Sequence, residues 1–258
     1  MNWLVFDIET VPDVELGRRV YGLEGLSDAQ VARAMFAQAR AASGSEFLPH
    51  EQHQVVAIAC ALRTREQFRI WSLGEPDAGE AELIKRFYDG IEKYTPDLVS
   101  WNGGGFDLPV LHYRALKAGV QAPRYWETGE DDTSFRYNNY LSRYHWRHLD
   151  LMDVLSSHNA RARASLEDMA ALLGLPGKLG FAGDQVWDAV LGGRLDAVRR
   201  YCETDVLNTT LVYLRFEFMR GRLDRAAYQS ELARVRATLA ASGEPHHAEF
   251  LAAWEPQA

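Results

Sequence analysis

The sequence predicts an α/β fold, in which a mixed sheet of about five β-strands is flanked by helices. Short apolar runs typical of strands alternate with amphipathic helical patterns, as in layered α/β proteins. A polar turn alone separates the second run from the third, which is a hairpin signal and adds antiparallel pairing to the sheet. The strand runs are residues 3–6, 54–62, 67–73 and 97–101, with a short edge strand or helix start at 148–154.

Composition limits the possible classes of protein. The chain has 258 residues, of which 47% are hydrophobic, so one large globular domain or one domain with appendages is expected. No apolar run reaches membrane-spanning length, no signal peptide is visible, and the two cysteines do not make a disulfide framework, so a cytoplasmic location is expected. The net charge of −8 argues against a protein that coats nucleic acid by bulk attraction, although bound metal ions would invert the sign locally.

The first strand run leads directly into two acids, Asp7 and Glu9. Residues two apart on a strand point the same way, so both carboxylates would share one face at the strand's end. No cationic residue lies nearby in sequence, and two like charges in a core are unfavourable unless a cation lies between them. One interpretation is a divalent cation bound by oxygen ligands; the other is a pair of ordinary acids facing water.

Residues 12–53 are predicted to form a helical insertion that ends in a loop. Ser27 and Gln30 make a capping-box pattern, and apolar residues recur after it at helical spacing. Residues 41–52 are small and polar, as in a mobile loop. A second amphipathic helix is predicted over residues 81–94, between the hairpin and the next strand.

A glycine-rich turn, Gly103 to Gly105, follows the strand predicted at residues 97–101. Its spacing does not match the dinucleotide fingerprint, so a phosphate-binding turn is the weaker interpretation. The next helix begins near Asp107, which would either cap the helix or contribute to a site at the carboxyl end of the strand.

Aromatic and arginine residues are concentrated between residues 124 and 147, where Arg143 and Tyr144 lie. Aromatic faces and guanidinium groups are what base stacking and phosphate contact require, so this segment is a candidate surface for unpaired nucleotides. The alternative is a long loop whose rings pack onto the domain. Asp150 and Asp153, which follow, are interpreted as residues that orient neighbours or cap a helix rather than as metal ligands.

A long helix in the last third of the chain carries Tyr201 and Asp205, which are four residues apart and share one helical face, whereas Glu203 projects elsewhere. An acid in an otherwise apolar helix needs a partner. The alternative is a half-buried ring near a surface acid. The loop at residues 174–183 contains Lys178, interpreted as a solvated charge with a smaller chance of contacting phosphate.

Three of these segments together resemble the motifs of DnaQ-like 3′-5′ exonucleases. The segments are Asp7 to Thr10 (D-I-E-T), Asn102 to Asp107, and Tyr201 to Asp205. The resemblance is closest to the proofreading domain of family B DNA polymerases and its stand-alone relatives, and it implies a ribonuclease H-like fold over roughly residues 1–220. The glycine triplet departs from the polymerase motif. Position 200 is arginine where a related subgroup has histidine, so the resemblance is to the tyrosine (DEDDy) subtype.

The resemblance also implies the chemistry. Two Mg²⁺ or Mn²⁺ ions would be bound, and Tyr201 would orient the attacking water. The metal ligands would be Asp7, Glu9, Asp107 and Asp205. The substrate contacts would be Thr10, Asn102, Phe106, Arg143 and Tyr144. The implied activity is release of 5′-mononucleotides from the 3′ end of single-stranded nucleic acid, with DNA favoured.

Three alternative functions stay open. A 3′-5′ exoribonuclease on the same fold would use the same residues. A non-catalytic nucleic-acid-binding module would need neither the four acids nor the tyrosine. A haloacid-dehalogenase-like phosphatase resembles the D-I-E-T segment loosely, because such enzymes usually have a second aspartate where Glu9 stands.

A C-terminal helical extension is predicted over residues 221–258, after an exonuclease domain at residues 1–220. One helix over residues 222–241 carries an apolar stripe, which would dock on the domain or make a dimer contact, so a monomer or weak dimer is expected. The stripe comprises Tyr228, Leu232, Val235 and Leu239. No polymerase domain follows, so a stand-alone exonuclease is expected.

Overall fold

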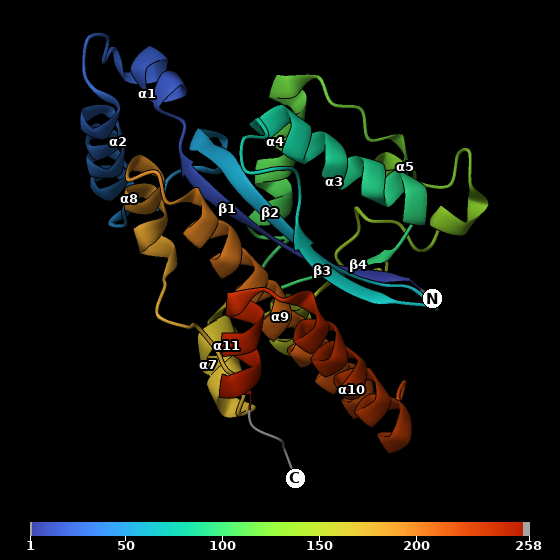
Figure 1. The fold of residues 1–258 in the computed structure, drawn as a ribbon. Helices are drawn as coiled ribbons and strands as arrows, with labels where there is room; N and C mark the ends of the chain where they lie inside the picture. Colours follow the sequence, from blue (N-terminus) through green and yellow to red (C-terminus); the bar gives the residue numbers. More distant parts are fainter. Residues whose placement is uncertain (1, 255–258) are drawn as a thin grey trace.

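The computed structural model describes residues 2–254, which form a mixed five-stranded sheet between two layers of helices (Figure 1). The strands lie in the order β3-β2-β1-β4-β5. β1 pairs antiparallel with β2 and parallel with β4, so the first strand of the chain is the centre of the sheet. The bounds are β1 Trp3–Pro12, β2 His53–Arg63, β3 Phe68–Ser72, β4 Asp97–Ser100 and β5 His148–Asp150. The predicted fold class is confirmed.

The helices cover both faces of the sheet. Helices α3 and α4 pack on one face, and the long helix α9 lies across β1 and β2 on the other, beside α10 and α11 (Figure 1). No helix in residues 2–254 is both long enough and apolar enough to cross a membrane. The bounds are α1 Val14–Tyr21, α2 Asp28–Ser43, α3 Glu80–Tyr94, α4 Asp107–Ala118, α5 Pro123–Trp126, α6 Leu151–Leu155, α7 Leu166–Leu172, α8 Val186–Leu191, α9 Leu195–Met219, α10 Arg225–Ser242 and α11 Pro245–Ala253.

The side chains of alternate residues in β1 point to opposite faces of the sheet. Phe6 and Ile8 are buried in the core beneath α3 and α4, whereas Val5 is buried in the core beneath α9. Asp7 and Glu9 follow Val5 at intervals of two residues and therefore point toward α9. The strand's apolar pattern thus determines which layer of helices meets the two acids.

β1 is longer than its apolar run predicts. It continues to Pro12, because β2 pairs with it along its whole length. Asp7 and Glu9 lie inside the strand, opposite Ala59 and Ala57, so the prediction that they lie at the strand's end is wrong. The register shifts directly after Glu9, and the small alanine side chains opposite leave space on this face for carboxylates.

The segment between β1 and β2 contains more helix than predicted. Helix α1 precedes the predicted helix, and α2 continues to Ser43. Gly17 of α1 lies so close to Met35 of α2 that an added Cβ would stand 2.4 Å from the Met35 sulfur. Leu48, in the part predicted as a loop, is buried with these helices, so the loop prediction for residues 41–52 is only partly right.

The apolar stripe of α10 packs within the chain. Tyr228, Val235 and Leu239 are buried in the same core as α9, together with Phe250 and Trp254 from the end of the chain. The stripe therefore docks on the sheet-and-helix core, as one of the two alternatives predicted. The division of the chain at residue 220 stays a prediction.

A buried ion-pair group ties the end of β1 to α4, the helix that begins with Asp107. Arg114 of α4 bonds to both Asp13 and Glu80, and the side chains of Arg114 and Asp13 are only 3% exposed. Burial opposes ionisation of Asp13, but hydrogen bonds from Lys117 and Arg114 lower its pKa to about 2. The group fixes the start of α4 relative to the central strand.

Replacing Arg114 with alanine is expected to destabilise the fold by about 3–5 kcal/mol, because Asp13 would stay buried with the exposed Lys117 as its remaining ion-pair partner. Urea denaturation followed by circular dichroism measures the loss. The matched control is Arg86→Ala, which breaks an exposed pair with Glu82 and should cost less than about 1 kcal/mol. Equal losses in the two variants would contradict this account.

The ion pairs of Asp13 also predict that the stability of the fold depends on pH. Because folding lowers the pKa of Asp13 from 3.8 to about 2, its stabilising contribution is fully present above the unfolded value. The contribution is lost as the pH falls from about 4 to 2.

Candidate active site

Four carboxylates that are distant in sequence meet where α9 lies against β1. Asp7 and Glu9 point from β1 toward α9, which carries Asp205, and Asp107 begins α4. The Asp7 carboxylate interacts electrostatically with each of the other three. The structure therefore brings together all four acids that the sequence motifs selected.

Glu9 and Asp107 are buried, Asp7 and Asp205 are half-buried, and the four acids repel one another. Burial raises the pKa of Asp7 and of Glu9 well above the usual range, and the neighbouring acids raise both further. Burial also raises the pKa of Asp107 to about 7 and that of Asp205 to about 6. Like charges in such a place need cations or protons to balance them, and oxygen ligands are what Mg²⁺ and Mn²⁺ prefer. The donor set fits divalent metal ions.

Asp107 is held in place by the central strand. Its Oδ1 accepts a hydrogen bond from the backbone N–H of Ile8 at 3.1 Å. Asp150 supports the turn before α4, because its carboxylate accepts the backbone N–H groups of Asn102 at 3.0 Å and Gly104 at 2.9 Å. The orienting role predicted for Asp150 is confirmed, and the N–H groups it occupies are not available to cradle a phosphate.

Close packing requires the glycines of this turn. Asn102 begins the turn with a left-handed φ of 65°. A Cβ on Gly103 would lie 2.3 Å from the Ser100 hydroxyl oxygen, and one on Gly105 would lie 2.4 Å from the Asn102 amide oxygen. The triplet, which departs from the polymerase motif, therefore allows a tight turn that starts α4 next to β1.

Thr10 and Phe106, which adjoin Glu9 and Asp107 in sequence, are linked by a group of rings that the sequence did not predict. The Phe106 ring meets His53 edge-on with 5.0 Å between centroids, and Phe47 contacts both rings. The Thr10 hydroxyl is hydrogen-bonded to Nδ1 of His53 at 2.8 Å. Phe47 is 58% exposed, so the group presents an aromatic surface beside the carboxylates. No local pattern indicated it, because its three rings come from separate parts of the chain.

Tyr201 is directed at the carboxylates. Its hydroxyl donates a hydrogen bond to Asp205, one helical turn later on α9, and its ring lies 5.1 Å from that of Phe181. The side chain is almost completely buried. Burial and the nearby acids raise the pKa of Tyr201, so the hydroxyl stays protonated as a donor.

Lys178, interpreted from the sequence as a solvated charge, acts on two of the four carboxylates. The positive charge of Lys178 favours the ionised forms of Glu9 and Asp205, against the effect of burial. Its loop is held by Asn208 of α9, whose amide exchanges hydrogen bonds with the backbone of Gly177. Lys178 lies nearly thirty residues from Asp205 in sequence, and only the packing of its loop on α9 brings their charges together.

The aromatic segment is divided between core and surface. Tyr125, Phe135 and Tyr140 are buried under α3 and α4, so the prediction of stacking surfaces is wrong for these rings. Tyr144 is 70% exposed, and Arg143 forms an ion pair with Asp153 at 2.6 Å. The structure does not bring the two proposed substrate contacts of this segment against the four acids.

The order and pairing of the strands, with α9 across the central strand, define a ribonuclease H-like α/β fold. The chain belongs to the family described as "Predicted 3'-5' exonuclease related to the exonuclease domain of PolB", whose model matches residues 45–254.

Relatives and a solved structure agree with this assignment. The chain is 28% identical over 163 residues to a DNA polymerase of Pyrococcus glycovorans, which covers 59% of this chain and 20% of the polymerase. It is 30% identical over 156 residues to a DNA polymerase of Thermococcus gorgonarius, and this match covers 58% of this chain and 20% of the polymerase. The family B DNA polymerase of Pyrobaculum calidifontis shares the fold, with a TM-score of 0.52 and 18% sequence identity. The match covers 93% of this chain and 28% of that polymerase. The chain thus spans about a fifth of the relatives' length.

Proposed function

We propose that the protein is a metal-dependent 3′-5′ exonuclease that releases 5′-mononucleotides from single-stranded nucleic acid. The observation that supports this most is the meeting of four carboxylates from β1, α4 and α9 in a chain of this exonuclease family. DNA is the favoured substrate because the similar proteins named above are DNA polymerases. An exoribonuclease on the same site is the alternative. A cytoplasmic location and a monomeric or weakly dimeric state stay predictions.

The carboxylates of Asp7, Glu9, Asp107 and Asp205 would hold two Mg²⁺ or Mn²⁺ ions. Such ions, when bound, help to ionise the attacking water and stabilise the leaving 3′ oxygen. The repulsion that raises the pKa of these acids is relieved by a bound cation. The four acids therefore supply both the binding energy and the position for the metal.

Tyr201 would hold the attacking water in line with the scissile phosphate. Its hydroxyl is already oriented by the hydrogen bond to Asp205, and its raised pKa keeps it a donor. Lys178, whose charge favours the ionised forms of Glu9 and Asp205, would balance negative charge on the phosphate.

The terminal nucleotide would contact residues beside the acids. Phe106, with Phe47 next to it, offers a ring for the terminal base, and Thr10 and Asn102 offer polar groups. Arg143 and Tyr144 would contact nucleotides further from the end, since Tyr144 is exposed and Arg143 is tied to Asp153. Stacking on such rings requires unpaired bases, which supports a single-stranded substrate.

Polarity and strand preference test this proposal. Matched oligonucleotides of DNA and RNA, single-stranded or in blunt duplex and labelled at either end, are digested in Mg²⁺ and sampled over time. The 3′ label should appear at once as a mononucleotide, with single strands degraded about tenfold or more faster than duplex, since each end base pair must first be unstacked. Loss of the 5′ label first, or equal rates on duplex and single strand, would contradict the proposal.

A further inference from the structure

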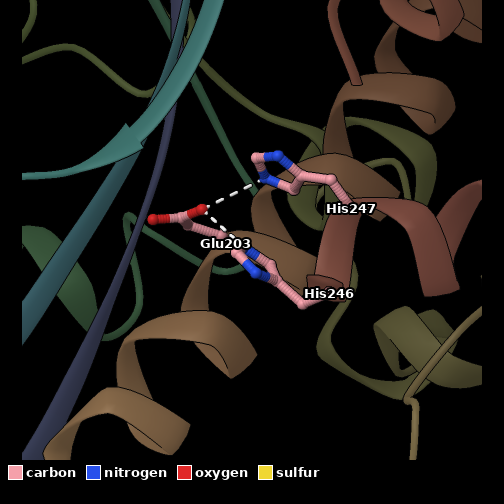
Figure 2. A group of neighbouring side chains, drawn as sticks. All are labelled: Glu203, His246 and His247. Carbon is pink, nitrogen blue, oxygen red and sulfur yellow. Dashed lines mark hydrogen bonds and ion pairs between the residues drawn. The ribbon is translucent and has the colours of Figure 1, made fainter. Parts of the chain in front are cut away.

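A second cluster of ligand-type side chains lies on the other side of α9. Glu203 is two residues before Asp205 but turns away from it, toward α11, where two neighbouring histidines face its carboxylate (Figure 2). The Nε2 atoms of His246 and His247 lie 2.8 and 3.2 Å from the same oxygen, Oε2 of Glu203. The ligand atoms of the three side chains all lie within 4.8 Å of one another. The cluster is separate from the four carboxylates of the proposed active site.

The arrangement requires a positive charge between the three groups. His247 is 2% exposed, and its Nε2 is buried without a hydrogen-bond partner although it is directed at Glu203. The Ser242 hydroxyl donates to the carbonyl oxygen of Leu239 and therefore accepts from Nδ1 of His247, so a neutral His247 would present its Nε2 lone pair to the carboxylate. If both histidines were protonated, two cations would be packed with 4.2 Å between ring centroids. A single cation bound by all three satisfies each group at once.

We propose that Glu203, His246 and His247 form a binding site for a transition-metal dication of the Zn²⁺ class. Two imidazoles and a carboxylate are a ligand set used for Zn²⁺, whereas Mg²⁺ prefers oxygen alone. Tetrahedral bonds of about 2.0–2.1 Å place ligand atoms about 3.3 Å apart. The two distances from Oε2 of Glu203 to the histidine nitrogens, 2.8 and 3.2 Å, therefore need to widen by only a few tenths of an ångström. The proposal does not depend on the nuclease function.

Neighbouring groups already orient the three ligands. Ser72 donates a hydrogen bond to the other carboxylate oxygen of Glu203 at 2.6 Å, which leaves Oε2 free for a cation. Nδ1 of His247 is hydrogen-bonded at 2.8 Å to the Ser242 hydroxyl, which itself donates to the carbonyl oxygen of Leu239; this favours the tautomer with a free lone pair on Nε2. All three ligands line an open groove, so water can complete the coordination.

The site would connect three parts of the chain. Glu203 belongs to α9, the histidines to α11 and the supporting Ser72 to β3. A bound ion would therefore clamp the C-terminal helix onto the helix that carries Tyr201 and Asp205, and stabilise the folded chain by mass action.

Zn²⁺ binding in the presence of excess Mg²⁺ tests the proposal, because Mg²⁺ competes for the oxygen ligands of the four carboxylates and not for the two imidazoles. Calorimetric titration of the full chain should show one Zn²⁺ bound, with a parallel rise in the melting temperature. His246→Gln and His247→Gln each remove a ligand and should weaken Zn²⁺ binding by about 100-fold or more, whereas Ser72→Ala should weaken it by about 10-fold. Circular dichroism without Zn²⁺ checks that each variant folds.

The control is Asp205→Asn, which alters the carboxylate site two residues away and should leave Zn²⁺ binding unchanged. Co²⁺ gives a second readout that does not depend on stability, since nitrogen-ligated four-coordinate Co²⁺ absorbs strongly in the visible and six-coordinate Co²⁺ with oxygen ligands only weakly. The band should appear in the wild type and in Asp205→Asn and be lost in both histidine variants. Equal Zn²⁺ affinity in the wild type and the histidine variants, or no Zn²⁺ binding in the wild type, would overturn the proposal.

Discussion

Asp7→Asn is expected to lower 3′-end cleavage by about 10³-fold or more. Metal ions contribute several kcal/mol of charge stabilisation to such reactions, and each 1.4 kcal/mol is a factor of about ten in rate. Asp7 interacts with all three other acids, so its loss should weaken metal binding at the whole cluster. Turnover on a 3′-labelled single strand and calorimetric titration with Mn²⁺ measure the two effects together.

The same substitution should stabilise the metal-free protein. Folding raises the pKa of Asp7, so above the unfolded value near 3.8 its charge destabilises the folded state, and this effect disappears as the pH falls below that value. At neutral pH in chelator, Asp7→Asn should raise the melting temperature by about 2–4 °C for each kcal/mol of repulsion removed. The control is Asp89→Asn, which alters an exposed acid. A lower melting temperature together with full activity would show that Asp7 is an ordinary structural residue.

Tyr201→Phe should lower the single-turnover rate about 100-fold while metal and substrate bind nearly as in the wild type. The substitution keeps the ring against Phe181 and all four carboxylates, and removes only the hydroxyl that is bonded to Asp205. A group that orients water acts mainly in the transition state, so the rate falls and the affinity does not. The loss should be smaller than for Asp7→Asn, because every metal ligand remains.

A second tyrosine on the same helix provides the control for this experiment. Tyr213 is buried and packs edge-on against Trp3, far along α9 from Asp205. Tyr213→Phe should leave the rate unchanged. If Tyr201→Phe and Tyr213→Phe both cleave at the wild-type rate at saturating Mg²⁺, Tyr201 is a packing residue only.

The parts of the site that could be predicted depend on local periodicity. The two-residue spacing of Asp7 and Glu9 and the four-residue spacing of Tyr201 and Asp205 determine which side chains share a face, whatever the rest of the chain does. The position of Asp107 followed from a strand that ends in a glycine turn. These three local patterns made the four acids candidates, and the resemblance of the three segments to exonuclease motifs selected them as one set, which the fold then brings together.

The parts that could not be predicted depend on contacts between distant segments. β1 extends past its apolar run because β2 pairs with it, and no pattern inside residues 7–12 contains that information. The rings of Phe47 and His53 reach Phe106 only through the packing of the insertion. The histidines beside Glu203 likewise come from a helix more than forty residues later, where they show no metal-ligand spacing of their own.

The central claim is that the four clustered carboxylates bind the metal ions with which the chain cleaves 3′ ends. Its most direct test is the release of the terminal nucleotide from a 3′-labelled DNA single strand by the purified wild type, measured in Mg²⁺ and in chelator with Asp7→Asn alongside. The account predicts labelled mononucleotide from the wild type in Mg²⁺ only, with activity restored when Mg²⁺ is returned to the chelated protein. Release in chelator, or equal release by Asp7→Asn, would contradict it.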